Sequence, residues 1–497
     1  MTQNTNVKVN LTSELRLKQA LKEADATVTH LTVSGTFTSE DFRYIRKKMN
    51  KTLRELDLGN ASTEKNKIQN WELTDCTELT SITIPASITG IGRYAFSSCD
   101  DLINIAIHPD NPVYTSENGV MFNKEKNGLL FCPKGRQGDF VIPCYVNKVG
   151  DEAFCGCSGL TSITIPDSLT EIGNNAFSGC SGLTSVIIPD SVVKIGNYAF
   201  SSCAGLTSIA IPASVVEIGE KAFVGCPELT SLAAHPDNRA YTSENGILFN
   251  KERTELIFYP PKQKGDYAIP DSIIKIGVGA FSGCSGLVSV IIPDSVVKIG
   301  DDAFGCCSGL TSINIPYSVI KIGENAFFSC SGLTSVVIPN SVVEIGWWAF
   351  CGCSGLTSIT IPDSVVQIGN FAFGDCTGLT SIAIPDSVVE IGLWAFCGCS
   401  GLTSIAIPDS VLQIGKTAFD GCTGLSSITI ANSVIETSDE SILYEAISRY
   451  NNENEERYKE YIEKSGRKNI DVADMSEEEE ANLGEFLSDT CDDDDDE

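Results

Sequence analysis

Apolar and polar residues follow each other in a fixed order along most of the chain, and residues 331–353, SGLTSVVIPNSVVEIGWWAFCGC, show this order in full. Leu333, Val336 and Ile338 follow the L-x-x-L-x-L pattern of a strand whose alternate side chains enter a core. The residues between them, such as Ser335, are expected to face outward. The proline that follows the strand cannot donate a backbone hydrogen bond, so it should end the strand.

The second half of the same stretch is expected to bring the chain back to its starting side. Gly346 recurs in every regular repeat, which suggests a turn that requires a positive φ. Ala349 and Phe350 should then point inward again. Cys353 closes the stretch and is expected to pack in the core as a small apolar side chain.

Thirteen cysteines hold the position of Cys353, spaced 23 residues apart except for two gaps of 58 residues. A fixed period in this range is typical of a solenoid, in which each repeat forms one coil about 5 Å from the next. We therefore predict an α/β-type leucine-rich repeat solenoid over residues 76–435, with about 17 strands. The thirteen are Cys76, Cys99, Cys157, Cys180, Cys203, Cys226, Cys284, Cys307, Cys330, Cys353, Cys376, Cys399 and Cys422.

The two long gaps contain matching inserts, at about residues 108–138 and 235–265. Each insert has an Asn-Gly pair between alternating apolar residues, which predicts a β-hairpin. His108 and His235 begin the inserts in place of the proline that ends a regular strand. A structural role at this turn is the simplest interpretation of both histidines.

Residues 1–75 are interpreted as an N-terminal cap with degenerate repeats. Residues 28–33 and 53–58 have the strand pattern, and SEDFRYIRKKM between them predicts a helix with Ser39 as its N-cap. At the other end, residues 436–470 are expected to form a helical cap. The apolar residues that would cover the last coil are Ile442, Leu443, Ala446 and Ile447.

The regular units, written CSGLTSITIPDSVVxIGxxAF, and the inserts of the type YTSENGVMFNKEK followed by FVIP resemble the BspA-like leucine-rich repeat proteins. The resemblance covers roughly residues 28–435. It implies a leucine-rich repeat fold with the characteristic hairpin repeat of that family. It also implies a source among host-associated bacteria or parasitic protists, and a surface protein that binds host matrix proteins or other cells.

The net charge of the 497 residues is −30, and residues 436–497 hold 23 Asp or Glu against 6 Lys or Arg, a net of −17. This charge argues against a nucleic-acid partner and favours a basic protein partner. No apolar run is long enough for a membrane span of about 20 residues, so no membrane insertion is expected. The N-terminus has no apolar signal core, which predicts a cytoplasmic protein; a trimmed signal or another route to the cell surface is the alternative.

Catalytic and cofactor motifs are missing from the sequence, which has no P-loop, G-x-S-x-G or dinucleotide fingerprint. We therefore expect no enzyme activity, no cofactor and no metal. Three Cys-x-Cys pairs lack the spacing and further ligands of a zinc site, and their first cysteines are expected on an outer turn as free thiols. The aspartates that follow the strand prolines favour Asx-type turns, with a calcium site as the alternative. The pairs are Cys155/Cys157, Cys351/Cys353 and Cys397/Cys399.

An aromatic group is the first candidate for partner binding. Trp348, Phe371 and Trp394 hold one position in three successive repeats, with Trp347 and Phe328 nearby. We expect them to form a stripe with steps of about 5 Å on the outer side. The alternative is lateral packing among the repeats or under the C-terminal helices.

Residues 471–497 are the second candidate, an acidic tail expected to be disordered. Leu483, Phe486 and Leu487 form a short apolar edge between EEEE and DDDDDE. Such a segment suits docking that orders on binding. The function that follows is a non-enzymatic protein-binding scaffold that uses the solenoid surface and the tail, with a BspA-like surface adhesin as the alternative.

Overall fold

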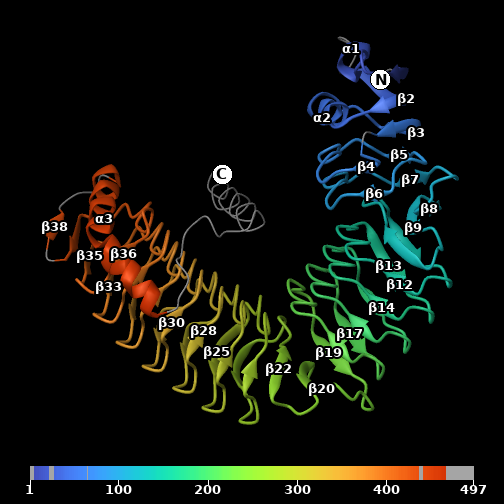
Figure 1. Cartoon of the computed structure of the whole chain (residues 1–497). Coiled ribbons are helices and arrows are strands. Elements are labelled where there is room, and N and C mark those ends of the chain that lie inside the picture. Colours follow the sequence, from blue (N-terminus) through green and yellow to red (C-terminus); the bar gives the residue numbers. More distant parts are fainter. Residues whose placement is uncertain (1–4, 22–26, 64, 432, 436–439, 466–497) are drawn as a thin grey trace, which may run out of the picture.

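The computed structural model describes residues 5–21, 27–63, 65–431, 433–435 and 440–465. The coils stack into an open arc, with α1 and α2 at one end and α3 at the other (Figure 1). The helices are α1 (Leu17–Leu21), α2 (Ser39–Lys48) and α3 (Glu440–Ser465). The leucine-rich repeat solenoid predicted from the 23-residue period is confirmed.

Each regular coil contributes one strand to a parallel ladder, which we call the first ladder. Its strands are the predicted L-x-x-L-x-L segments, and their partners in the next coil lie 23 residues away, as Ser312 and Ser335 do. The ladder forms three sheets. The first sheet contains β1 (Thr5–Leu11), β2 (Val28–Phe37), β3 (Glu55–Thr63), β5 (Ser81–Ile84) and β7 (Asn104–Ile107). The second contains β11 (Gly138–Val141), β13 (Leu160–Thr164), β15 (Ser185–Ile187), β17 (Ser208–Ile211) and β19 (Ser231–Ala234). The third contains β23 (Gly265–Ala268), β25 (Leu287–Ile291), β27 (Ser312–Asn314), β29 (Ser335–Val337), β31 (Ser358–Thr360), β33 (Ser381–Ala383), β35 (Ser404–Ile407), β37 (Ser427–Ile430) and the antiparallel β38 (Ser433–Ile435).

A second ladder of two-residue strands was not predicted. Its strands are the two residues that precede the glycine at the repeat position of Gly346. In the coil of Gly346 they are Glu344 and Ile345. β4 (Lys67–Ile68) pairs with β6 (Gly90–Ile91). The next sheet contains β8 (Tyr114–Glu117), β9 (Val120–Asn123), β10 (Gly128–Phe131), β12 (Lys148–Val149), β14 (Glu171–Ile172), β16 (Lys194–Ile195) and β18 (Glu217–Ile218). The last contains β20 (Tyr241–Glu244), β21 (Ile247–Asn250), β22 (Glu255–Phe258), β24 (Lys275–Ile276), β26 (Lys298–Ile299), β28 (Lys321–Ile322), β30 (Glu344–Ile345), β32 (Gln367–Ile368), β34 (Glu390–Ile391) and β36 (Gln413–Ile414).

The core lies between the two ladders and runs along the axis of the solenoid. One phenylalanine from each regular coil stacks on the next, as Phe304 does on Phe327 with ring centroids 5.4 Å apart and ring planes 3° apart. Such stacks repeat from coil to coil because every coil places the ring at the same height. The core therefore consists of side-chain columns rather than of one compact cluster.

The ladder cysteines are buried, and each of the regular ones also acts as a hydrogen-bond donor. Cys353 Sγ donates to the Phe327 carbonyl oxygen at 3.2 Å, and Cys376 Sγ donates to Phe350 in the same way at 3.2 Å. Burial raises the pKa of the Cys353 thiol well above its usual range, so the sulfur keeps the proton that it donates. The prediction of a small apolar core side chain is confirmed, but it missed this bond.

The predicted positive φ at Gly346 is wrong. A Cβ at Gly346 would lie 2.9 Å from the backbone carbonyl group of Gly323, the equivalent glycine of the preceding coil. Glycine is needed here because neighbouring coils approach closely, and not because of its own backbone angle. The left-handed conformation occurs two residues later, at Trp348, with φ of 52°.

The two inserts form the predicted hairpins, and each adds a third strand that continues the second ladder. β20 and β21 pair antiparallel around Asn245 and Gly246, which both have positive φ, as a tight hairpin turn requires. β22 pairs antiparallel with β21 and parallel with β24. His235 Nδ1 accepts the Asp237 backbone N–H at 3.2 Å, which agrees with the predicted structural role.

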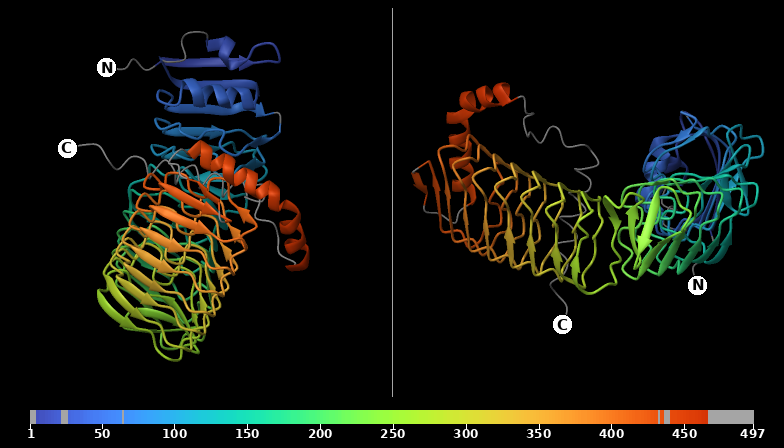
Figure 2. Two further views of the ribbon diagram at one scale, coloured as in Figure 1. Left: turned by 90° about the vertical axis from the view of Figure 1, so that its left-hand side faces the viewer. Right: turned by 90° about the horizontal axis from the view of Figure 1, so that it is seen from below.

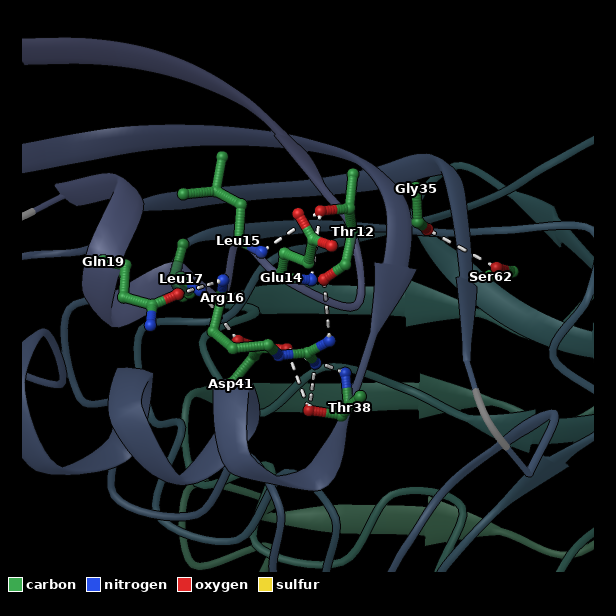
Figure 3. Close-up of polar contacts among 10 residues, drawn as sticks. All are labelled: Thr12, Glu14, Leu15, Arg16, Leu17, Gln19, Gly35, Thr38, Asp41 and Ser62. Atoms are coloured by element: carbon green, nitrogen blue, oxygen red, sulfur yellow. Dashed lines mark hydrogen bonds and ion pairs between the residues drawn. The ribbon is translucent and has the colours of Figure 1, made fainter.

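Within residues 1–75, β1 precedes the two predicted strands and pairs in parallel with β2. The helix-capping residue of α2 is Thr38 and not Ser39, because Asp41 accepts the Thr38 backbone N–H at 3.0 Å and its hydroxyl at 2.9 Å. The Asp41 carboxylate also pairs with the Arg16 guanidinium (Figure 3). This buried carboxylate therefore joins α2 to the first loop of the chain.

α3 covers the other end of the solenoid and lies beside the last coils (Figure 2). Leu443 and Ile447 are buried, as predicted, and they belong to the core cluster that runs from Ile247 to the C-terminal end of the solenoid. The Asn451 amide donates to the Ile414 carbonyl at 2.6 Å and accepts the Ile414 N–H at 3.0 Å. One side chain thus satisfies the edge of β36 that a further coil would otherwise pair with.

Candidate partner-binding surface

The predicted aromatic stripe lies at the left-handed position of three successive coils. Trp348, Phe371 and Trp394 have φ of 52°, 53° and 52°. In other coils this position holds residues that adopt positive φ more readily, such as Asn175 and Asn325. Bulky aromatic residues are uncommon in this conformation. The left-handed backbone therefore costs more free energy at these three residues than it costs at an asparagine, and other contacts must offset the difference.

The three rings form one continuous stack. The centroids of Trp348 and Phe371 are 5.2 Å apart, and those of Phe371 and Trp394 are 5.0 Å apart, with ring planes 11° and 12° from parallel. Offset stacking of this kind contributes roughly 0.5–1.5 kcal/mol per pair. The predicted steps of about 5 Å are confirmed. Exposure varies along the stack, because Phe371 is only 3% exposed between two half-buried tryptophans.

Trp347 and Phe328 do not extend this stack. Trp347 meets Trp348 edge-on, with centroids 6.0 Å apart and ring planes 69° apart. Phe328 occupies the repeat position that Cys351 holds in the next coil, three residues after the left-handed position. The aromatic surface is therefore the stack of Trp348, Phe371 and Trp394 with Trp347 at one end, which we call the aromatic stack.

Two cysteines lie directly behind the aromatic stack. A Cβ at Gly374 would lie 3.3 Å from both Cys351 Sγ and Cys397 Sγ and 3.5 Å from the Phe371 ring, so a glycine leaves room for all three. Cys351 is 1% exposed, and its predicted place on an outer turn is wrong because the ring of Phe371 and the neighbouring coils enclose it.

These two thiols are not poised for chemistry. Burial raises the pKa of Cys397 to about 12, and burial also raises the pKa of Cys351. Both sulfurs therefore stay protonated at neutral pH, and a protonated thiol is a poor nucleophile. Their α-carbons belong to coils two steps, or about 10 Å, apart, which is too far for a disulfide.

Two clefts, which sequence patterns did not reveal, lie beside the hairpins, where the second ladder is interrupted. The first has a volume of about 630 Å³, and Arg93 on one side bonds Glu152 on the other at 2.7 Å. The second has a volume of about 420 Å³ and includes Lys221, which reaches Asp302 at 2.5 Å. Each ion pair crosses a break in the ladder, so it joins two segments of the solenoid.

Three further predictions from the sequence concern the tail and the whole chain. Leu483, Phe486 and Leu487 lie outside the described residues. Within the parts that the structure describes, no three His, Cys, Asp or Glu side chains gather as a metal site would require. None of the described helices combines the length and the apolar character needed to cross a membrane.

Comparison with known proteins identifies the repeats. The family profile of the BspA type leucine rich repeat region matches residues 40–127, 130–244, 257–377 and 348–457. No curated protein matches the chain.

Three solved bacterial structures are similar to this chain. A leucine-rich repeat protein from Eubacterium ventriosum is 23% identical, with 78% of this chain and 88% of that chain covered and a TM-score of 0.48. A leucine rich cell surface protein from Faecalibacterium prausnitzii is 28% identical, with 75% and 84% covered and a TM-score of 0.42. A leucine-rich repeat protein from Bacteroides ovatus is 27% identical, with 69% and 82% covered and a TM-score of 0.34.

Proposed function

Because this chain belongs to the BspA-type leucine-rich repeat family, we propose that it is a non-enzymatic scaffold that binds a protein partner. Repeat solenoids offer long surfaces on which single coils differ while the backbone stays constant. The features that distinguish coils are therefore the natural sites of specific recognition. In this chain the aromatic stack is the most prominent such feature.

The observation that carries the proposal is the aromatic stack itself. Trp348 and Trp394 remain half-buried rather than enclosed, and both keep a left-handed backbone that suits a smaller residue. Tryptophan is enriched among the residues that dominate binding energy at protein interfaces. A rigid stack also loses little side-chain entropy when a partner covers it.

The acidic tail is the second part of the proposal. Its charge is expected to attract a basic protein over a range of about 8–10 Å near physiological ionic strength. The apolar edge formed by Leu483, Phe486 and Leu487 would then slow dissociation by burying surface that salt does not screen. Neutralising Asp492 to Glu497 should lower the association rate, whereas Leu483→Ala with Phe486→Ala should raise the dissociation rate.

Affinity capture with paired variants tests the role of the aromatic stack. Trp348→Asn with Trp394→Asn replaces both rings by the residue that the fold itself uses at Asn175 and Asn325. We expect weaker capture of the main partner and a nearly unchanged thermal transition. The matched control is Tyr198→Asn, because Tyr198 holds the same left-handed position with φ of 54° in another segment.

Two results would contradict the aromatic site. A large fall in melting temperature for the tryptophan pair would show that the stack serves folding. Equal loss of capture for Tyr198→Asn would show that no single coil carries specificity. The tail should be removed only from residue 470 onward, because α3 ends at Ser465 and covers the last coil.

A surface adhesin is the second candidate function. The outward row of the first ladder exposes isolated large aliphatic side chains, including Ile187 and Ile291, which suit contacts with an extended matrix protein. Labelling intact cells with a membrane-impermeant reagent separates the two functions. Labelled protein would favour the adhesin, whereas protection until lysis would favour a scaffold inside the cell.

A further inference from the structure

Five exposed side chains and one half-buried lysine on three successive coils form a second surface, separate from the aromatic stack. Its aliphatic row is Ile274, Val297 and Ile320, which are 46%, 48% and 63% exposed. Its basic row consists of the residues that follow each of them in the chain. We call the six residues the aliphatic–lysine surface; the basic row is Lys275, Lys298 and Lys321.

The two rows stand side by side because of the backbone at this corner of each coil. Val296 and Ile299 are buried, so the two residues between them, Val297 and Lys298, both lie outside the core. The Val297 N–H donates to the Ile274 carbonyl at 2.9 Å, which holds successive coils in register. The rows therefore advance by about 5 Å per coil and form a continuous stripe, unlike single exposed apolar residues.

The lysines make this stripe locally basic in a chain of net charge −30. Lys275 contacts Glu255 at 2.6 Å, and Lys321 contacts Glu344 at 2.8 Å. Lys298, between them, contacts no carboxylate in the described parts of the chain. Asp301 lies three residues further on, and its Oδ1 already accepts the Glu324 N–H at 3.0 Å. Lys298 is thus available to an acidic ligand.

The same two repeat positions continue along the solenoid as far as the last coil, where α3 covers them. Leu412 is the counterpart of Val297 in the last coil and is only 8% exposed. α3 lies against that coil, and the Tyr450 hydroxyl donates to the Val411 carbonyl at 2.7 Å. The C-terminal extension therefore already packs on one end of this stripe.

The residues that follow α3 have the chemistry that matches the uncovered part. Residues 477–480 are four glutamates, residues 492–497 are five aspartates and a glutamate, and Leu483, Phe486 and Leu487 lie between them. Beside α3 the charged row holds Gln413, the next three coils hold Glu390, Gln367 and Glu344, and the three coils beyond them hold the lysines. An acidic segment is therefore attracted to the three coils that carry lysines and not to those nearer α3.

The connecting chain is long enough for this contact. Residues 466–482 comprise 17 residues, which can span at most about 58 Å when fully extended. The order of the second ladder places β28, β26 and β24 four, five and six coils from β36, the strand next to α3. These steps correspond to about 20–30 Å.

We infer that the aliphatic–lysine surface is the docking site of the chain's own acidic segment, residues 477–497. The three apolar side chains cover the aliphatic row, and the flanking carboxylates pair with the lysines, Lys298 first. The contact goes beyond the proposed function, because a docked segment is withheld from any basic partner until that partner displaces it. It can be measured without a partner, so its failure is distinct from failure of the proposed function.

Carbodiimide cross-linking of the purified full-length chain tests this contact, because the reagent joins an amine to a carboxylate that touches it. Peptide mass spectrometry should find Lys298 joined to the peptides that contain residues 477–480 or 492–497. Lys298 is the reporter, since Lys275 and Lys321 already have neighbouring carboxylates. The product should remain monomeric, and high salt should reduce its yield.

Two pairs of variants make the test specific. Val297→Ser with Ile320→Ser should lower the Lys298 cross-link about tenfold, because it removes most of the apolar contact. Val193→Ser with Val216→Ser changes the same row in another segment, where both side chains are also exposed, and should have no effect. Circular dichroism should show equal melting for both pairs.

Three outcomes would overturn the inference. Cross-links spread evenly over Lys148, Lys194 and Lys298 would show that the tail has no preferred site. A Lys298 cross-link confined to dimers and rising with protein concentration would assign the surface to a second copy. An unchanged yield in the Val297→Ser, Ile320→Ser chain would show that the aliphatic row takes no part.

Discussion

At the scale of single residues, the ladder cysteines combine two properties that usually belong to different side chains. Each fills a small apolar space in the core, and those after Cys76 also donate a hydrogen bond across coils, as Cys353 does to the Phe327 carbonyl. Serine can donate but is less apolar, and alanine is apolar but cannot donate. This combination explains why the position holds cysteine in thirteen repeats.

Cys353→Ser should lower the free energy of unfolding by roughly 1–3 kcal/mol, because a hydroxyl is costlier to bury and its shorter bond to Cβ moves the donor away from Phe327. Urea unfolding in reducing buffer would measure this loss. The control is Cys144→Ser, which changes an exposed cysteine and should alter stability by less than about 0.5 kcal/mol. A neutral effect of Cys353→Ser would show that the coils relax around the hydroxyl.

Residue patterns predicted what each position buries, but not what it meets in the next coil. The inward places of Leu333, Phe350 and Cys353 follow from apolar periodicity and agree with the structure. The need for glycine at Gly346 cannot be read from this periodicity, because it arises from the close approach of the Gly323 backbone in the preceding coil. The left-handed position was detectable in principle, since Asn175, Asn325 and Asp302 hold it in other coils.

At the scale of elements, the hairpins depend on one buried asparagine each. Asn238 donates to the carbonyls of Pro212 and Val215 at 2.6 and 2.9 Å. Its Oδ1 accepts the N–H groups of Ala240 and Tyr241, both at 2.8 Å. This side chain therefore joins the start of the hairpin to the preceding coil, and Asn111 does the same in the first insert.

Asn238→Ala should lower the free energy of unfolding by about 3 kcal/mol, because it leaves several buried backbone groups without a partner. Hydrogen exchange should also quicken first in β20 and β21. His235→Ala is the control, since His235 is exposed and accepts only one bond, at 3.2 Å. Equal exchange rates in both variants would show that strand pairing alone holds the hairpin.

The two hairpins were predictable as elements because their turns and alternation are local signals. The second ladder was not, since two residues are too few for a pattern, and its strands exist only because each coil supports the next. The N-cap of α2 was misplaced by one residue for a similar reason. Its identity depends on Asp41, whose carboxylate also serves Arg16 from an earlier loop.

At the scale of the whole molecule, a sequence pattern that is weak in one repeat predicts the fold because it recurs in every coil. The period of 23 residues was enough to predict the solenoid and the steps of about 5 Å in the aromatic stack. The period could not predict which contacts cover the two ends of the solenoid, because α3, Asn451 and β1 belong to no repeat. The aliphatic–lysine surface does not follow from the sequence pattern either, since each Val-Lys or Ile-Lys pair is ordinary by itself and becomes a surface only when three coils align.

The buried thiols should make the whole solenoid sensitive to alkaline pH. Burial raises the pKa of Cys180, Cys353 and Cys376 well above the ordinary range, whereas an unfolded thiol titrates near pH 8.5. Above about pH 8.5 the unfolded chain releases protons that the folded chain keeps, so each such thiol lowers stability by about 1.4 kcal/mol per pH unit. Below that pH the protonation states match, and these thiols cause no change.

Urea midpoints measured anaerobically in reducing buffer should therefore be level from about pH 7 to 8 and fall steeply by about pH 9.5. Cys353→Ala removes one thiol, so its free energy of unfolding should fall with pH less steeply, by about 1.4 kcal/mol per pH unit. Its urea midpoint at neutral pH should nevertheless be lower than that of the original chain. Cys144→Ala should keep the original slope, because Cys144 is exposed. A level profile throughout would mean that the ladder sulfurs do not titrate on unfolding, as oxidised sulfurs would not, and would contradict a ladder of reduced thiols.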